Sequence, residues 1–213
     1  MNAREYLNGL FLFSDKKNAE ADTERIISSF SGFTDIANTD KYILETVIGC
    51  SEKNADFLRL VSAITSRRIV DKFKNGKKYS QNELKEYMIG LSFGLAVETV
   101  HLILFDNFGK MIDTVHLGDG VVNSAGFIPR KMLDVAVRKN AKSAILTHNH
   151  PTGVAKPSEN DLNATYIAST VLANVGIKLT AHYIVSGFKV LDCLPIVVGG
   201  NKDQDSVGKP ILK

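Results

Sequence analysis

The chain has 213 residues, 44% of them hydrophobic, which is enough for one large or two small domains with a buried core. A net charge of +3 is too small to indicate nucleic-acid binding by itself, and no apolar run approaches the ~20 residues that cross a bilayer. The opening MNAREYLNGLFLF lacks the features of a secretory signal, so we expect a globular cytoplasmic protein without a membrane partner.

Residues 1–75 are predicted to be helical. Asp22-Thr23 and Thr39-Asp40 are candidate helix N-caps. Apolar residues then recur at helical spacing, namely Phe57, Leu58, Val61 and Ile64. Because these helices are short and joined by brief turns, we expect a small bundle that ends at the polar stretch Lys74–Lys78.

Residues 76–198 are predicted to form a mixed α/β domain, because strand and helix patterns alternate. The expected strands are 99–106, 111–117, 143–148 and 178–185, and the expected helices are 129–138 and 158–175. The polar, glycine-bearing residues 199–213 are expected to be a flexible tail.

Two histidines lie one residue apart at the end of an apolar strand. His148 and His150 should point to the same face, since strand side chains alternate with period two. Ser158 predicts a helix start with Asp161 in its first turn, where the helix dipole keeps a carboxylate ionised. Each motif alone is common, and Ser-x-x-Asp resembles an ordinary capping box. Their joint spacing is what indicates a metal site.

Two imidazoles and one carboxylate leave a fourth coordination position open. Three protein ligands are typical of catalytic zinc, whereas structural zinc is normally closed by a fourth ligand, often cysteine. Neither Cys50 nor Cys193 has metal-type spacing. The pattern therefore predicts one Zn²⁺ per chain in a catalytic site.

The pattern His148-x-His150, seven residues, Ser158, two residues, Asp161 resembles the signature of the JAMM (MPN+) metalloproteases. The surrounding His-Asn-His-Pro-Thr-Gly and Lys-Pro-Ser resemble its bacterial RadC branch, which usually has serine at the position of Thr152. Further landmarks of that branch are matched by Gly120, Pro129-Arg130 and Asn140-Ala141. The resemblance implies a helix-hairpin-helix-like domain at residues 1–75, followed at 76–198 by a JAMM/MPN (cytidine-deaminase-like) domain.

The resemblance also implies roles for individual residues. Zn²⁺ would be held by His148, His150 and Asp161. Glu98, at the start of the strand before the hairpin, would be the general base that takes a proton from the zinc-bound water. Ser158 would stabilise the oxyanion. The residues alone favour a solvated strand-edge carboxylate for Glu98, and they are compatible with a simple N-cap role for Ser158.

A fifth site residue is implied less directly. His182 lies where RadC proteins have an Asp-His pair, but the preceding residue here is Ala181. We expect His182 to support a metal ligand, with its family partner missing.

Three classes of function remain open. The first is a zinc-dependent metallopeptidase or isopeptidase that acts on a peptide or protein tail. The second is a DNA-associated protein whose metal domain only binds. The DNA-binding hypothesis is weakened by the turn Ile48-Gly49-Cys50, which has only one glycine. A DNA-binding helical hairpin uses a Gly-hydrophobic-Gly turn, whose backbone N–H groups can approach a phosphate. A metal-dependent phosphodiesterase ranks third, because it would favour a second metal and more carboxylates.

Overall fold

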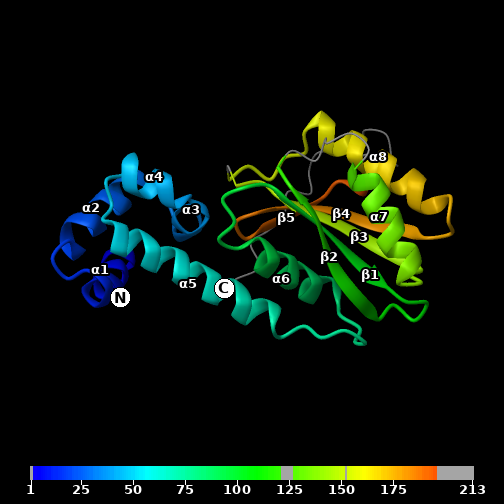
Figure 1. Cartoon of the computed structure of the whole chain (residues 1–213), viewed down its shortest axis with the longest axis horizontal. Helices are drawn as coiled ribbons and strands as arrows, with labels where there is room; N and C mark the ends of the chain where they lie inside the picture. The colour runs from blue at the N-terminus through cyan, green and yellow to red at the C-terminus, as the bar shows by residue number, and fades with distance from the viewer. Residues whose placement is uncertain (1, 121–126, 152, 196–213) are drawn as a thin grey trace.

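The computed structural model of the chain describes residues 2–120, 127–151 and 153–195. The predicted tail, 199–213, lies outside the described residues. A helical N-terminal region is followed by an α/β domain, as the sequence predicts (Figure 1). No helix within the described ranges is both long enough and apolar enough to cross a membrane.

The N-terminal region is a bundle of helices around its own core. Its helices are α1 (Ala3–Ser14), α2 (Ala19–Ser29), α3 (Phe33–Asn38), α4 (Lys41–Thr46) and α5 (Glu52–Val70). The predicted cap at Asp40 is confirmed, since its side chain accepts a hydrogen bond from the Tyr42 backbone N–H at 2.7 Å. Large side chains with no exposed surface fill the centre, among them Leu7, Phe11, Ile26 and Leu44.

The predicted helix start at Asp22-Thr23 is wrong, because α2 begins at Ala19. Asp22 is fully buried inside the bundle, where its carboxylate accepts hydrogen bonds from the Ser51 N–H at 3.0 Å and the Asn54 side-chain amide at 2.8 Å. Arg25 pairs with it at 2.8 Å. Asp22 therefore acts as a buried anion that ties α2 to the start of α5.

We expect Asp22→Ala to lower the free energy of unfolding by about 2 to 4 kcal/mol, because buried donors lose their acceptor. Burial opposes ionisation of Asp22, but hydrogen bonds from Ser51 and Asn54 outweigh it, and its pKa lies below the ordinary 3.8. The stabilisation is thus present above about pH 4 and lost as the pH falls through the folded-state pKa. Urea unfolding at pH 7 and pH 3 measures this. A gap between wild type and Asp22→Ala that does not narrow at pH 3 would contradict it.

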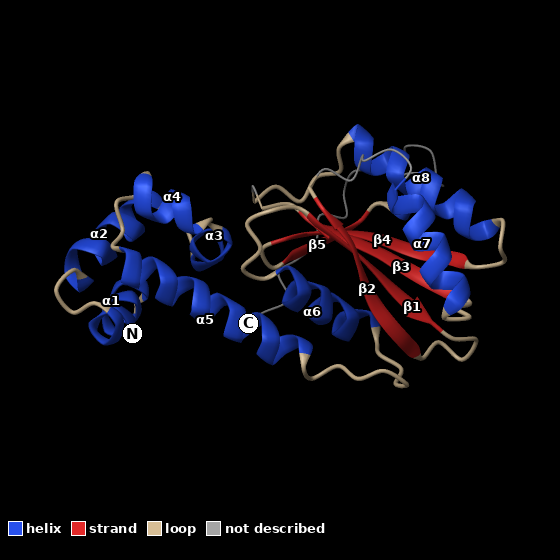
Figure 2. Cartoon of the chain, viewed as in Figure 1, coloured by secondary structure: helices blue, strands red, loops and turns tan. Residues whose placement is uncertain are grey.

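The α/β domain contains a five-stranded sheet of order β2-β1-β3-β4-β5 (Figure 2). Its strands are β1 (Thr99–Phe105), β2 (Met111–Asp119), β3 (Ser143–Asn149), β4 (Lys178–Ser186) and β5 (Lys189–Asp192). The β3–β4 pair is parallel, and the other neighbours are antiparallel. Its helices are α6 (Gln81–Ser92), α7 (Phe127–Arg138) and α8 (Glu159–Ala173). Strands β1 and β2 form an antiparallel hairpin, and the chain crosses from β3 through α8 to the parallel strand β4.

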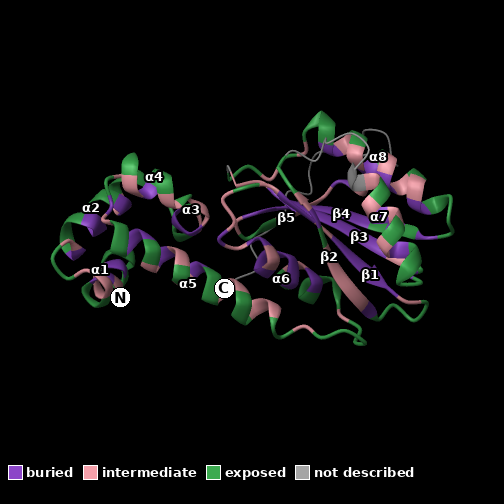
Figure 3. Cartoon of the chain, viewed as in Figure 1, coloured by how far each residue is buried: buried purple, intermediate pink, exposed green. Residues whose placement is uncertain are grey.

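Each face of the sheet is covered by different helices, so the central strands are buried on both sides (Figure 3). Alternate residues such as Leu102 and Leu146 pack against α7 and α8. The residues between them, such as Ile103 and Ile145, pack against α6. His148 continues the series that faces α7 and α8, and this places the candidate metal site on that side.

Helix α6 joins the two parts of the molecule and has no counterpart among the expected elements. Its N-terminus is a capping box between Ser80 and Glu83. On its outer side, a Cβ added to Gly90 would lie 2.6 Å from the Ile69 side chain of α5, so only glycine allows this close approach.

Arg59 of α5 also links the N-terminal helices to the segment that follows α6. Its guanidinium donates to the Ala37, Thr39 and Gly94 carbonyls. The domain boundary at residues 75/76 stays a prediction.

Candidate metal centre

Two chain segments bring the ligand candidates together. β3 carries His148 to the end of the sheet, and the His150 N–H donates to the Val185 carbonyl of β4 at 2.8 Å. The chain then returns through a turn and starts α8, where Ser158 and Asp161 form the capping box. Because Asp161 is in the first helical turn, its carboxylate faces the end of β3.

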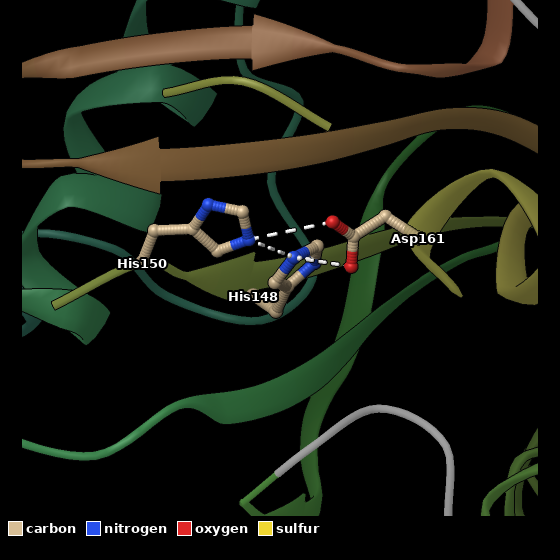
Figure 4. A group of neighbouring side chains, drawn as sticks. All are labelled: His148, His150 and Asp161. Carbon is tan, nitrogen blue, oxygen red and sulfur yellow. Dashed lines mark hydrogen bonds and ion pairs between the residues drawn. The ribbon is translucent and has the colours of Figure 1, made fainter. Parts of the chain in front are cut away.

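The three candidate ligands converge on one point (Figure 4). The Nε2 atoms of His148 and His150 lie 3.0 Å apart. Asp161 Oδ1 lies 3.1 Å from His148 Nε2, and Oδ2 lies 3.4 Å from His150 Nε2. Within the part of the chain that the structure describes, this is the only group of three or more His, Cys, Asp or Glu side chains arranged to hold an ion.

The outer nitrogen of His148 is held by a chain of hydrogen bonds. Its Nδ1 lies 3.0 Å from His182 Nε2, and His182 Nδ1 lies 2.6 Å from the Thr165 hydroxyl. Thr165 donates its proton to the Asp161 carbonyl at 2.6 Å, so it can only accept from His182 Nδ1–H. Burial lowers the pKa of His182 to about 3, and its neutral Nε2 must then accept from His148 Nδ1–H. His148 Nε2 therefore presents a lone pair to the site.

His150 has the same tautomer for a different reason. Its Nδ1 lies 3.0 Å from the Val154 carbonyl oxygen, which can only accept, so Nδ1 carries the proton. Gly153 makes this return of the chain possible, since its φ of 83° is strained for other residues. His150 Nε2 is thus a second lone pair directed at the same point.

The donor set fits a metal ion. Two bare ring nitrogens and a carboxylate only accept hydrogen bonds, so a cation between them is needed to offset their mutual repulsion. Nitrogens about 2.0–2.1 Å from a tetrahedral ion would be ~3.3 Å apart, close to the separation of the two Nε2 atoms. His148 and Asp161 are buried and His150 is half-buried, so the group is exposed only on the His150 side.

The electrostatics agree with this fit. When no ion is bound, a proton on Nε2 of His148 or His150 can take the same position. Burial of Asp161 opposes its ionisation, but hydrogen bonds from these protonated rings outweigh it and hold the carboxyl pKa well below its usual range. The hydrogen bond with Asp161 likewise raises the pKa of His150, despite burial. Both shifts mean that the cluster attracts positive charge.

Glu98 is not part of the ligand group, but it is close enough for its charge to act on His150. It immediately precedes β1 and is half-buried. Val100 pairs with His148, so strand alternation puts Glu98 on the His148 side of the sheet. Its negative charge also contributes to the raised pKa of His150, after the larger effect of Asp161. The predicted role of Glu98 as general base stays a prediction.

Ser158 adjoins the ligands, but its hydroxyl is engaged. It donates to Asp161 Oδ2 at 2.7 Å, as does the Ser158 N–H. The N-cap interpretation is thus confirmed, and the predicted oxyanion role stays a prediction. A donated hydrogen bond to substrate would require the hydroxyl to turn away from Asp161.

The comparisons with known proteins agree with the site. The sequence pattern of the family described as RadC-like JAB domain matches residues 78–191, more than half of the chain. The chain belongs to the RadC family. All the candidate ligands, Glu98 and Ser158 fall within the matched range of this RadC-family protein.

Three relatives of this RadC-family protein, each named as a UPF0758 protein, show how far the similarity extends. The relative from Shewanella woodyi is 26% identical over 175 residues, which cover 82% of this chain and 78% of the relative. Relatives from Photobacterium profundum and Aeromonas hydrophila are 31% and 30% identical over 135 and 129 residues. Those matches cover 63% and 60% of this chain, and 60% and 58% of the respective relatives.

His182 lies at the site, next to His148. The alanine at position 181, where RadC proteins have aspartate, does not deprive His182 of a partner. Ala181 packs in the core beneath α6, on the sheet face opposite to His182. An aspartate there would point away from the imidazole, so its absence does not leave His182 without support. The support comes from Thr165, which the sequence interpretation missed because it lies 17 residues away on α8.

We expect Thr165→Val to weaken metal affinity about 10- to 100-fold, because partners that orient a ligating histidine typically contribute that much. Valine keeps the shape but cannot accept from His182 Nδ1–H, so the tautomer of His148 is no longer fixed. Competition with a chromophoric zinc chelator measures the dissociation constant. Thr170→Val, at an exposed position of the same helix, is the matched control. Equal affinities in both variants would refute the hydrogen-bond chain.

Proposed function

We propose that this RadC-family protein is a zinc-dependent hydrolase that cleaves an amide bond in a peptide or in an isopeptide-linked protein tail. The observation that carries the proposal is the convergence of two imidazole Nε2 atoms and a carboxylate on one point, with Glu98 outside the ligand group but close enough for its charge to act on His150. Three protein ligands are typical of catalytic zinc. Zinc bound there would lower the pKa of a water molecule to about 7 and polarise a carbonyl oxygen.

The ligand types favour zinc over the hard cations. Imidazole suits zinc and its neighbours in the first transition series, whereas magnesium and calcium are held by oxygen atoms alone. Cys50 and Cys193 are both buried free thiols outside the group. We therefore expect a site of nitrogen and oxygen ligands only.

Glu98 supplies the proton transfer in this proposal. A carboxylate that faces the metal without ligating it can take a proton from the nucleophile and return it to the leaving amine. The half-buried position on the His148 side of the sheet supports this role. Ser158, once its hydroxyl turns from Asp161, would donate to the developing oxyanion.

DNA association has less support at the turn between α4 and α5. The Cys50 N–H donates to the Leu44 carbonyl at 2.9 Å, and the Ser51 N–H donates to the Asp22 carboxylate. A phosphate would have to displace the Leu44 carbonyl from one donor and the Asp22 carboxylate from the other, and it would meet the negative charge of that carboxylate.

Zinc-loaded protein should be tested against a quenched-fluorescence peptide library and against peptides joined through a lysine side chain. We expect cleavage of at least one of the two classes, loss of cleavage with 1,10-phenanthroline, and recovery when zinc is returned. A folded protein that holds zinc and cleaves neither class would overturn the proposal.

A further inference from the structure

Asn149, the residue between the two histidines, is buried and bound to the segment around Glu98. Its side-chain Oδ1 accepts from the Thr99 N–H at 2.8 Å, and its Nδ2 donates to the Val97 carbonyl at 2.9 Å. The assignment of the two amide atoms is unambiguous, because a backbone N–H only donates and a carbonyl only accepts. The two contacted groups lie on either side of Glu98.

The side chain of Asn149 replaces main-chain pairing where the sheet opens. Backbone pairing between β1 and β3 ends at Val100 and His148, whereas pairing between β3 and β4 continues to Asn149 and Val185. Beyond Val100, the carboxamide continues the link between β3 and the chain that enters β1. The Glu98 carbonyl is held on its other side by the Gly120 N–H at 2.7 Å.

We propose that Asn149 is a positioning residue that fixes Glu98 relative to His148 and His150. It does so by one side chain that is at once donor and acceptor to the two peptide groups that flank Glu98. This inference rests on the proposed function, in which Glu98 acts at the metal. Only a carboxamide provides both halves of the contact in the available shape. Aspartate would place a negative oxygen against the Val97 carbonyl, and alanine would leave both buried groups unsatisfied.

The test uses full-length protein loaded with Co²⁺, whose visible absorption changes with pH when groups at the metal titrate. We expect Glu98→Gln to shift the midpoint of this change by about one pH unit, since a single charge within ~6 Å has an effect of that order. Asn149→Ala should shift it in the same direction by about half as much or more. The double variant should match Glu98→Gln alone, because two residues that act through one contact are not additive.

Asn149→Leu, which is close to asparagine in shape and adds no charge, is the second variant if Asn149→Ala does not fold. Thr180→Val is the control, because it also removes a side-chain bond across strands, to the Ala144 carbonyl at 3.0 Å at the far end of β3. It should leave the midpoint unchanged. All variants should still bind one Co²⁺.

Three results would overturn the inference, and they are distinguishable. If Glu98→Gln shifts the midpoint and neither Asn149 variant does, the positioning role fails and the proposed function stands. If the Asn149 variants lose the metal, the residue serves the ligands and not Glu98. If Glu98→Gln itself has no effect, the placement of Glu98 in the proposed function fails as well.

Discussion

Replacement of His148 by alanine is expected to weaken zinc binding about 100- to 1,000-fold. Apparent binding energies of structural zinc sites are roughly 10–16 kcal/mol, or about 3–4 kcal/mol for each of four ligands. Each 1.4 kcal/mol is a factor of about ten in the dissociation constant. His148 is the most deeply buried ligand and also connects the site to His182, so its loss should be at the upper end.

His101→Ala is the matched control for that experiment. His101 is a half-buried histidine on β1 that lies outside the ligand group. Its ring is tilted against that of His116, with the two ring centroids 5.5 Å apart. Burial, and then the charge of His116, lowers its pKa to about 4. Its removal should leave the zinc dissociation constant unchanged, as measured by chelator competition. If both variants bind zinc as wild type does, the ligand assignment is wrong.

Glu98→Gln is expected to reduce hydrolysis of any substrate found by about 10²- to 10⁴-fold while zinc stays bound. A positioned acid–base group contributes that range, and glutamine has the shape of glutamate but cannot carry the proton. The rate and the zinc content should be measured on the same preparation. Loss of zinc in Glu98→Gln would make it a ligand, and an unchanged rate would exclude it as the general base.

Glu159→Gln separates a proton-transfer role from a general charge effect. Glu159 is an exposed carboxylate in the first turn of α8, two residues before Asp161. Removing its charge changes the field near the site without touching the group that we expect to carry the proton. Its rate should stay within a few-fold of wild type. If Glu159→Gln reduced the rate of hydrolysis as much as Glu98→Gln does, the effect of Glu98 would be explained by the negative charge near the site and not by proton transfer.

Local patterns were sufficient to predict most of the α/β domain. Short, mainly apolar runs bounded by turn residues predicted β1, β3 and β4 to within one residue. The period-two rule for strands then predicted that His148 and His150 share one face. The Ser158 cap gave the start of α8. Strand alternation alone would also have put Ala181 and His182 on opposite faces.

What the sequence could not reveal depends on contacts between distant segments. Gly90 weakens the helical pattern of α6 in the sequence. Glycine is required there because the Ile69 side chain of α5 occupies the space that a Cβ atom would need. Asp22 resembles a surface cap until Ser51 and Asn54 are seen to bind it, 29 and 32 residues away. Two hydrogen bonds that support the site also could not be predicted from residue spacing. They join Thr165 to His182 and Asn149 to the Thr99 N–H next to Glu98.

X-ray absorption spectroscopy of the zinc-loaded protein tests the metal assignment most directly. We expect four nitrogen or oxygen neighbours at about 2.0 Å, two of them with the outer-shell scattering of imidazole, and one imidazole fewer in His150→Ala. Sulfur at about 2.3 Å, an unchanged imidazole count in His150→Ala, or a protein that takes up no zinc would contradict a metal centre built from His148, His150 and Asp161.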